Sequence, residues 1–469
     1  MRRRSIFCLA VLLAGLATPV AALDTNRTIV RIQGNLVGRT VIQAICGLLH
    51  CQVVGSLDGL PGETEPSSLF VVRNLPPPSW LLNYTLLGIE AVEPDLPAGV
   101  NSDGQEVWYS TQATAAVLDQ LWDRTPASYF GTSAWRSYLE QPAAAIVRVQ
   151  ETHCGLHATG AGTVAVIDTG VDPTHPTLAP VLSQGYDFTR NVEGGSERAD
   201  VDQATAAVLD GIYGVNQATA AVLDQATAAV LDDDAHSHFG HGTMVAGMVH
   251  LAAPAASIMP LKAFDASGQG YTSDIIRALV YATRKGAKVV NMSFSRPTPS
   301  RELKRALDYA TSHGLILVAS AGNDGQSTLM YPAAYDNVMG VASTSNDDVR
   351  SSFSNYGAGL VWVAAPGEGV LTTYPWSSFA AAWGTSFSTP LVAGGAALLV
   401  GLEGSVNQDQ AAGAIAQAQP LTPELGHGRL DLFQAVSAGR NLWPNAPESA
   451  LPDSCDASGV DWSPEEQQP

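Results

Sequence analysis

Basic residues are scarce in this 469-residue sequence. It contains 24 Lys and Arg against 44 Asp and Glu, which gives a formal net charge of −20 at pH 7. A chain so acidic is repelled by phosphate backbones and anionic lipids, so the composition argues against nucleic acid or a membrane surface as the main partner. Beyond residue 22 the sequence also lacks an apolar run of about 18 residues, and we therefore predict no membrane span.

Cysteine is rare as well, with five in the whole chain. Cys8 lies in the N-terminal segment, and Cys46, Cys51, Cys154 and Cys455 remain. These four do not form two close pairs, which argues against a zinc site. A local pair, Cys46 with Cys51, and a long-range pair, Cys154 with Cys455, is the simplest of three connectivities; unpaired buried thiols are the alternative.

The N-terminal segment has the three parts of a secretory signal peptide. Three arginines (Arg2–Arg4) precede an apolar run (Ile6–Leu16), and Val20-Ala21-Ala22 resembles a signal-peptidase site. We therefore predict a signal peptide over residues 1–22 and a secreted protein, extracellular or periplasmic. That destination permits disulfide bonds.

Residues 23–98 alternate between β-rich and helical segments in the order βαββαβ, typical of a small α+β domain. The runs are Thr28–Gln33, Thr40–His50, Gln52–Gly55, Ser68–Arg73, Trp80–Leu87 and Ile89–Val92. Such a domain between a signal peptide and an enzyme is either a propeptide or an accessory domain. Residues 99–140 are rich in Pro, Ser, Gly and Asp and predict a linker with the maturation site, and residues 446–469 predict a disordered tail.

An octapeptide, Gln-Ala-Thr-Ala-Ala-Val-Leu-Asp, occurs four times, at 112–119, 203–210, 217–224 and 225–232. Eight residues turn an α-helix through roughly 800°, so its Val-Leu pair moves about 80° around the helix with each copy. Such repeats cannot keep one buried face. We predict a solvated insertion over 203–234 and prefer it to an oligomerisation device.

From 141 to 445, continuous Val/Ile/Leu runs alternate with helical segments, which predicts an α/β domain with a mostly parallel sheet covered by helices on both faces. The expected strands are Thr163–Ile167, Ser257–Lys262, Lys288–Met292, Leu315–Ala319, Val338–Ala342 and Leu360–Ala364. In such sheets, ligands bind at the carboxyl ends of the strands. Functional residues are therefore expected just after these runs.

Three short motifs carry groups that acyl transfer requires. Asp168 follows the first expected strand, His241 begins the small-residue helix Gly240–Gly247, and Ser386 precedes the apolar helix Leu391–Val400. Taken singly, they could be a turn aspartate, a helix-capping histidine and an N-cap serine. All three together, each within a fuller pattern, favour catalysis.

In their motifs and in the order Asp, His, Ser, these residues resemble the subtilisin-like serine peptidases over about 140–440. The resemblance implies a secreted serine endopeptidase, made as a self-processing precursor, that hydrolyses peptide bonds through an acyl-enzyme. Ser386 would attack the carbonyl, His241 would transfer protons, and Asp168 would orient His241. Asn323, in Ala319–Gly325, would donate to the oxyanion together with the Ser386 N–H.

The resemblance also implies where substrate binds, as an added β-strand. The substrate-binding residues expected from it are Ser293, Phe294, Ser295, Gly268, Gly270, Ala321 and Gly322. Two departures from the family are notable, since Ser295 and Arg296 stand where glycines are common, and Met330 lies near the expected base of the first specificity pocket. We therefore predict a narrowed pocket that disfavours bulky side chains.

The chemistry implied needs no cofactor. Many subtilases bind structural calcium through an acidic residue shortly after the catalytic aspartate, but Thr177 stands at that place here. The run Asp232–Asp234 is an alternative ligand set or a solvated loop. The expected partners are polypeptide substrates and the chain's own propeptide, and the expected state is a monomer.

Two other classes of function compete with the peptidase. In a catalytically silent binding protein, the insertion within the 73 residues that separate Asp168 from His241 would blunt turnover. The presence of all four catalytic residue types argues against this alternative. A metal-dependent hydrolase lacks support because the sequence contains no two-histidine helix motif.

Overall fold

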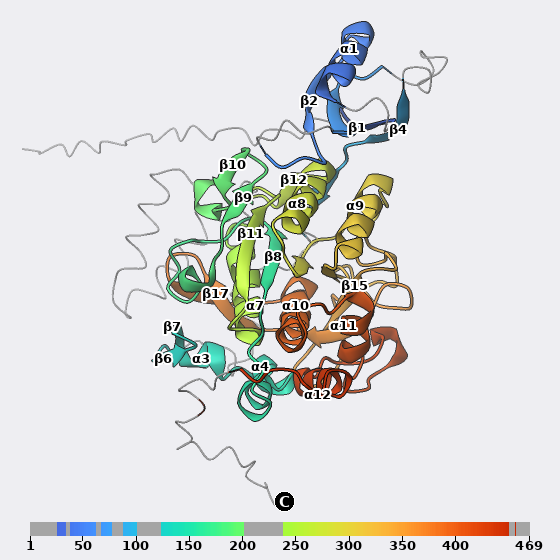
Figure 1. Cartoon of the computed structure of the whole chain (residues 1–469). Helices are drawn as coiled ribbons and strands as arrows, with labels where there is room; N and C mark the ends of the chain where they lie inside the picture. Colours follow the sequence, from blue (N-terminus) through green and yellow to red (C-terminus); the bar gives the residue numbers. More distant parts are fainter. Residues whose placement is uncertain are drawn as a thin grey trace, which may run out of the picture.

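The computed structural model describes residues 26–33, 38–61, 67–76, 88–100, 123–200, 238–449 and Cys455. Six predicted features lie wholly or partly outside them, one of which is the linker over 99–140, of which 101–122 are not described. The other five are the signal peptide, the helix over 80–87, every copy of the octapeptide, the run Asp232–Asp234 and the tail after 449 except Cys455. Figure 1 shows a small N-terminal domain above a larger one.

The small domain is a four-stranded antiparallel sheet with one described helix, in the order β2-β3-β1-β4. Its elements are β1 (Arg27–Ile32), α1 (Arg39–Leu49), β2 (Gln52–Ser56), β3 (Leu69–Arg73) and β4 (Ile89–Pro94). Alternate strand residues, among them Val30 and Phe70, pack with Ile42 of the helix to form its core. A Cys46–Cys51 disulfide joins the end of α1 to the residue before β2, as predicted.

The large domain contains an eight-stranded sheet with strand order β10-β9-β11-β8-β13-β14-β15-β16. All its pairings are parallel except that of β10 with β9. The strands are β8 (Thr163–Asp168), β9 (Gly185–Asp187), β10 (Val192–Gly194), β11 (Ser257–Lys262), β13 (Val289–Met292), β14 (Ile316–Ser320), β15 (Met339–Thr344) and β16 (Val363–Pro366). The predicted fold class is confirmed.

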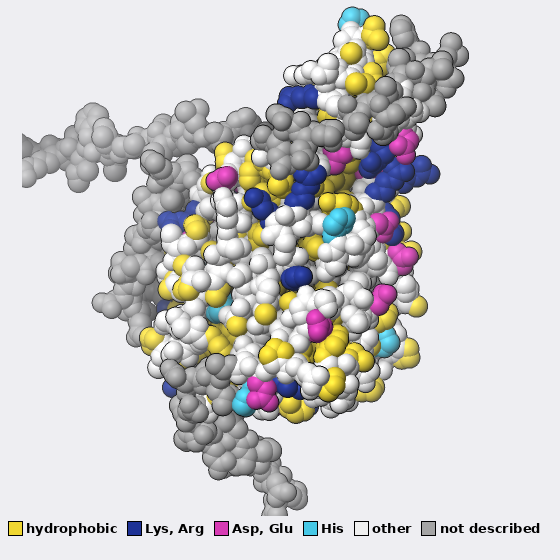
Figure 2. All heavy atoms as spheres, viewed as in Figure 1, with side chains coloured by type: hydrophobic (Ala, Val, Ile, Leu, Met, Phe, Trp, Pro, Cys, Tyr) yellow, Lys and Arg dark blue, Asp and Glu magenta, His cyan; other side chains and the backbone are white. Residues whose placement is uncertain are grey.

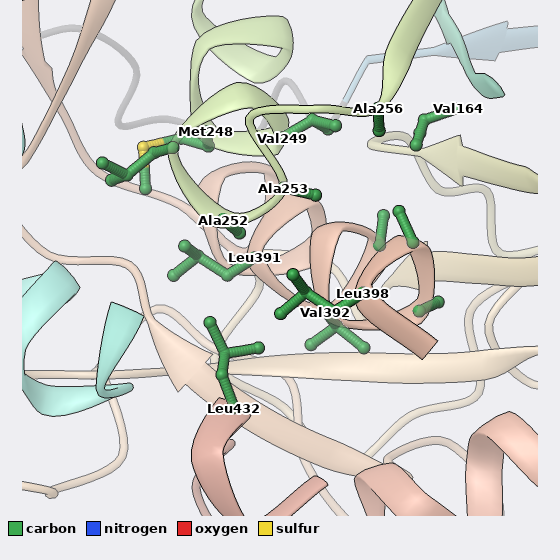
Figure 3. Packing of buried hydrophobic residues seen from close by; sticks show 14 of the residues in the cluster. Val164, Met248, Val249, Ala252, Ala253, Ala256, Leu391, Val392, Leu398 and Leu432 are labelled. Carbon is green, nitrogen blue, oxygen red and sulfur yellow. The ribbon is translucent and has the colours of Figure 1, made fainter. Parts of the chain in front are cut away.

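Helices cover both faces of this sheet because successive strand residues point in opposite directions. Val164 and Val166 of β8 face α7 and α10, whereas Ala165 and Ile167 face α8 and α9. The helices are α7 (His241–Ala252), α8 (Thr272–Arg284), α9 (Arg301–Ser312), α10 (Thr385–Leu402), α11 (Gln408–Ile415) and α12 (Leu432–Leu442). Figure 3 shows α7 packed against α10 through small and branched side chains.

Helix α10 is, within the described ranges, the single helix long and apolar enough to cross a membrane. Of its 18 residues, 94% are buried by the rest of the protein. It is in contact with α7, α11 and α12 and with five strands of the large sheet. Its apolar character is therefore explained by its place in the protein core.

The prediction that residues 99–140 form a linker is wrong for residues 126–139, which form regular secondary structure. Within residues 99–140, β6 (Pro126–Tyr129) and β7 (Thr132–Trp135) form a hairpin, and α3 (Arg136–Leu139) follows it. Two buried tyrosines fix this segment to helix α7, because Tyr129 Oη donates to the Leu251 carbonyl and Tyr138 Oη to the Gly247 carbonyl. The burial of these aromatic side chains thus gives the segment a regular structure, although its composition is typical of turns.

A second hairpin and a second disulfide complete the large domain. Strands β17 (Val370–Tyr374) and β18 (Ser378–Ala382) pair before α10. Cys154 lies in the helical turn Glu151–Gly155, before β8, and forms the predicted disulfide with Cys455. The bond spans 301 residues and connects the segment before the sheet with the C-terminal tail.

Two buried histidines should make the fold sensitive to acid. Burial lowers the pKa of His153 to about 4 and that of His250 to about 3, the latter with help from His153 and His175. Both pKa values lie below the unfolded value of 6.5, so the unfolded chain binds protons first as pH falls. Between pH 6.5 and 5, each histidine should cost about 2 kcal/mol of folding stability.

The measurement is the free energy of unfolding at several pH values for wild type and for His250→Asn. Between pH 6.5 and 5 the two histidines should lower the free energy of unfolding of the wild type. In the variant this decrease should be about half as large, whatever the stability of the variant at pH 7. Exposed His313→Asn is the control and should keep the full decrease. An unchanged pH dependence in His250→Asn would contradict the assignment.

Candidate active site

Asp168 and His241 lie in direct contact at the carboxyl end of the sheet. Asp168 is the last residue of β8, and His241 is the first residue of α7. His241 Nδ1 lies 2.7 Å from Asp168 Oδ1, which also accepts a 2.7 Å hydrogen bond from the Thr169 N–H. Both side chains are at least 95% buried. A buried carboxylate at this distance fixes the imidazole with Nδ1 protonated.

Glycines allow this contact because β8 and α7 meet backbone to backbone. A Cβ on Gly242 would lie 2.0 Å from the Gly170 carbonyl oxygen, and one on Gly170 would lie 2.7 Å from the Glu197 nitrogen. Gly170 also has a φ of 105°, which favours glycine. The small residues around His241 in the sequence are therefore explained by packing.

Ser386 lies in the first turn of α10, on the same side of the sheet. Its Oγ donates to the Ser293 carbonyl at 3.3 Å, and Ser293 Oγ donates to the Ser386 carbonyl at 2.8 Å. The ring of the next residue, Phe387, lies 5.5 Å from the ring of His241. The structure thus brings Ser386 next to the predicted substrate-binding residue Ser293 and close to His241.

Asn323 reaches the start of α10 from the loop after β14. Its Oδ1 accepts hydrogen bonds from the Thr385 N–H at 2.9 Å and from Thr385 Oγ1 at 2.8 Å. Because the oxygen is used in this way, the NH₂ group is the end of the amide that can donate to a ligand beside Ser386. Ala321 and Gly322 precede it as a buried turn, with Gly322 at φ 100°.

Two buried ionisable residues that the sequence did not predict bind groups next to Asp168 and His241. Glu197 accepts from the Gly240 N–H at 2.9 Å and from the Thr243 hydroxyl, both at the start of α7. Burial raises the pKa of Glu197 well above its usual range. Lys262 donates to the Thr169 carbonyl at 2.6 Å and to Asp200 at 2.6 Å. No motif surrounds either residue, so the sequence held no signal for them.

The other predicted substrate-binding residues form two edges with a strand of the small domain between them. That strand is β5 (Pro97–Gly99), and it pairs antiparallel with β12 (Gln269–Tyr271), where Ala98 faces Gly270. Next to β12, the Val100 N–H donates to the Gly268 carbonyl at 2.9 Å. On the other side of β5, Gly99 forms a β-bridge with Ser295. Phe294 is fully buried beneath this edge.

The segment after Asp168 does not fit a calcium ion. Asp172 uses Oδ1 to accept from the Thr174 N–H and Oδ2 to accept from the Trp376 N–H, each at 2.9 Å. Thr177 donates to the Ser133 carbonyl at 2.8 Å. Across the described ranges there is no group of three or more His, Cys, Asp or Glu side chains that could hold a metal ion. We therefore assign no ion to this segment.

A sheet of this order, with an aspartate, a histidine and a serine at its carboxyl edge, defines a serine peptidase of the subtilisin type. The model of the Subtilase family (Peptidase_S8) matches residues 160–435, more than half of the chain, and the protein belongs to that family. Subtilases need no cofactor for their chemistry.

Individual proteins with similar sequences are consistent with this family assignment. The chain is 37% identical to thermitase of Thermoactinomyces vulgaris over 266 residues, which is 54% of this chain and 81% of that protein. It is 37% identical to subtilisin BL of Lederbergia lenta over 251 residues, 51% of this chain and 77% of that one. An alkaline protease of Shouchella clausii is 35% identical over 284 residues, 56% of this chain and 63% of the relative.

A solved structure supports the fold. Fervidolysin from Fervidobacterium pennivorans, described as a keratinolytic enzyme related to subtilisin, is similar with a TM-score of 0.63 and 22% identity. The similarity covers 91% of this chain and 61% of fervidolysin. At this identity the similarity concerns the fold alone.

Proposed function

We propose that this protein is a secreted serine endopeptidase that hydrolyses peptide bonds through an acyl-enzyme. The observation that carries the proposal is the 2.7 Å contact between Asp168 and His241, next to the helix whose first turn contains Ser386. His241 takes the proton of Ser386 Oγ as it attacks the carbonyl carbon, then protonates the leaving amine. Asp168 stabilises the imidazolium, and water repeats the two steps to release the acyl group.

Asn323 and the Ser386 N–H stabilise the oxyanion of the tetrahedral intermediate. The amide of Asn323 is oriented by Thr385, and the Ser386 N–H lies at the start of α10, where the helix dipole favours negative charge. Two fixed donors in a buried site need no reorganisation as the charge forms. This arrangement supports acyl transfer over simple peptide binding.

Substrate binds as an extended strand in the place that β5 occupies. Ser293, Phe294 and Ser295 form one edge, and Gly268 and Gly270 belong to the other. Main-chain hydrogen bonds to both edges hold a peptide of any sequence in one register. Ala321 and Gly322 line the first specificity pocket.

The small domain acts as a propeptide that inhibits the enzyme until it is cut off. Its strand β5 lies between the edges that substrate needs, so the two cannot bind together. Self-processing after residue 100 would free these edges. Residues 1–22 direct export, and the named relatives support an extracellular location.

Met330 narrows the first specificity pocket. A Cβ on Gly322 would lie 3.3 Å from Ser295 Oγ and 3.4 Å from Met330 Cγ, so these three residues converge. Replacing Met330 with glycine should raise kcat/KM for peptides with Phe or Tyr before the cut about tenfold relative to Ala. A peptide library measures both profiles, and a wild-type profile dominated by large aromatics would refute the narrowing.

The proposed function is tested by labelling the purified, processed protein with a fluorophosphonate and mapping the modified peptide by mass spectrometry. The expected result is one label on Ser386, since the reagent reacts with an activated serine and not with ordinary hydroxyls. A folded, propeptide-free protein that takes no label, or takes it elsewhere, would contradict the proposal.

A further inference from the structure

Two carboxylates of the small domain bind the starts of two helices of the large domain. Asp95 accepts from the Ser273 N–H at 2.9 Å and from Ser273 Oγ at 2.8 Å, in the first turn of α8. Glu93 accepts from the Arg301 N–H at 3.0 Å, in the first turn of α9, and from the Ser300 hydroxyl. Helix starts carry partial positive charge and unpaired N–H groups. Together they accept two acidic side chains that are two positions apart in the sequence.

Arg296 adds a full positive charge at the same place. It is 4% exposed, and its Nη1 donates to the hydroxyl of Thr272, the first residue of α8. Its Nε has no hydrogen-bond partner among the residues that the structure describes. Burial lowers the pKa of Arg296, whereas Tyr335, Glu93 and Asp95 raise it. A buried cation with an unused donor beside two helix starts is a site built for an anion.

Of the other charged residues at the junction, some belong to the small domain and some to the large domain. Arg27 and Arg31, which pair with Asp95 and Glu302, belong to the small domain and leave with it. Arg296 stays. Asp274 also stays, and burial raises its pKa to about 7. Figure 2 shows Lys and Arg side chains beside Asp and Glu where the small domain meets the large one.

Asp95 and Glu93 lie a short, fixed number of residues before β5, the strand that occupies the substrate position. The Leu96 carbonyl accepts from the Thr272 N–H at 3.1 Å and from its hydroxyl at 2.8 Å, so the backbone contact continues from Asp95 into β5. Asp95 lies four residues before Gly99, the residue that pairs with Ser295, and Glu93 lies six before it. Glu93 is held in β4 by its pairing with Ile29, so a free peptide presents the same two positions to the helix starts when it binds in this register and continues along the same path.

We propose that, after the small domain has left, Arg296 and the starts of α8 and α9 form a binding site for acidic residues of substrates. The inference rests on the proposed function. The enzyme then selects substrates with Asp or Glu four and six positions before the residue that pairs with Ser295. Specificity extends beyond the residues next to the cut, through charge and not through a side-chain pocket.

The test uses the processed enzyme and two internally quenched peptides with the same cleavable core. One carries Val-Glu-Pro-Asp-Leu before the core, at the spacing of the small domain, and the other carries Val-Gln-Pro-Asn-Leu. At low salt, kcat/KM should be about ten- to a hundredfold higher for the acidic peptide, the size expected for hydrogen bonds to charged groups. The preference should fall steeply with added salt.

Arg296→Met should reduce the preference at least fivefold. Lys304→Met removes a charge from the partly exposed side of α9, where Lys304 pairs with Asp308, and should keep the preference intact. If Arg296→Met does not fold, the inference is tested by the wild type alone, whose preference for the acidic peptide should fall steeply with added salt. Equal rates for the two peptides at low salt would overturn the inference and leave the proposed function standing.

Cleavage of neither peptide would instead be a failure of the proposed function. The site is then tested on the same processed protein by fluorescence anisotropy with labelled forms of the two peptides, since the small domain no longer covers the edges there. Tighter binding of the acidic peptide, about tenfold or more, would support the site. Equal binding of both peptides would overturn it.

Discussion

Replacing Ser386 with alanine is expected to lower kcat about 10⁶-fold, the loss that removal of the nucleophile from a subtilisin-type triad produces. Without Oγ no acyl-enzyme forms, and His241 has no hydroxyl proton to accept. Labelling by fluorophosphonate and removal of the small domain should disappear together. Hydrolysis of a chromogenic peptide and the mass of the purified chain measure both effects.

Ser388→Ala is the matched control. Ser388 lies in the same turn of α10 and is fully buried, and its Oγ has no hydrogen-bond partner within the described ranges. Its removal should leave activity and processing within about threefold of wild type. If Ser386→Ala retained wild-type turnover while Ser388→Ala lost it, the nucleophile would have been assigned to the wrong serine.

Replacing Asn323 with alanine is expected to lower kcat about 10²–10³-fold with little change in KM. This is the size of the loss known for the oxyanion-hole asparagine of a subtilisin. The donor acts on a charge that exists only in the transition state, so substrate binding should be nearly unchanged. Steady-state kinetics on one peptide substrate separate the two constants.

Thr385→Val tests how the asparagine is oriented. It removes the hydroxyl that donates to Asn323 Oδ1 and keeps the backbone N–H that donates to the same oxygen. One of two hydrogen bonds remains, so we expect a loss of kcat of about tenfold, smaller than for Asn323→Ala. A rise in KM at constant kcat for Asn323→Ala would contradict an oxyanion role and indicate ground-state binding.

The sheet could be predicted because buried parallel strands are continuous apolar runs. Five of the six expected strands lie within two residues of the observed ones. The sixth, Leu360–Ala364, begins three residues later as β16, since the Leu360 and Val361 N–H groups bond to the Gly357 carbonyl in a turn. Apolar residues of a buried turn resemble those of a strand, so composition cannot separate them.

The candidate catalytic residues could be predicted because each stands in a local sequence motif. The buried residues that contact their neighbours, Glu197 and Lys262, could not be predicted. Glu197 is 44 residues before His241 in the sequence, and Lys262 is 94 residues after Asp168. They meet the start of α7 and the Thr169 carbonyl only once the chain has folded. The hairpin β6–β7 was missed for a related reason, since its anchors, Tyr129 and Tyr138, bond to carbonyls of α7 more than 100 residues away.

The disulfide between Cys154 and Cys455 closes a covalent ring around nearly the whole large domain. Any single backbone cut between these two residues, by this enzyme or another, leaves the two pieces joined. A nicked molecule therefore keeps Asp168, His241, Asn323 and Ser386 on one covalent particle. It runs as one species without reductant and as two with it, so damage to this protease is visible only after reduction.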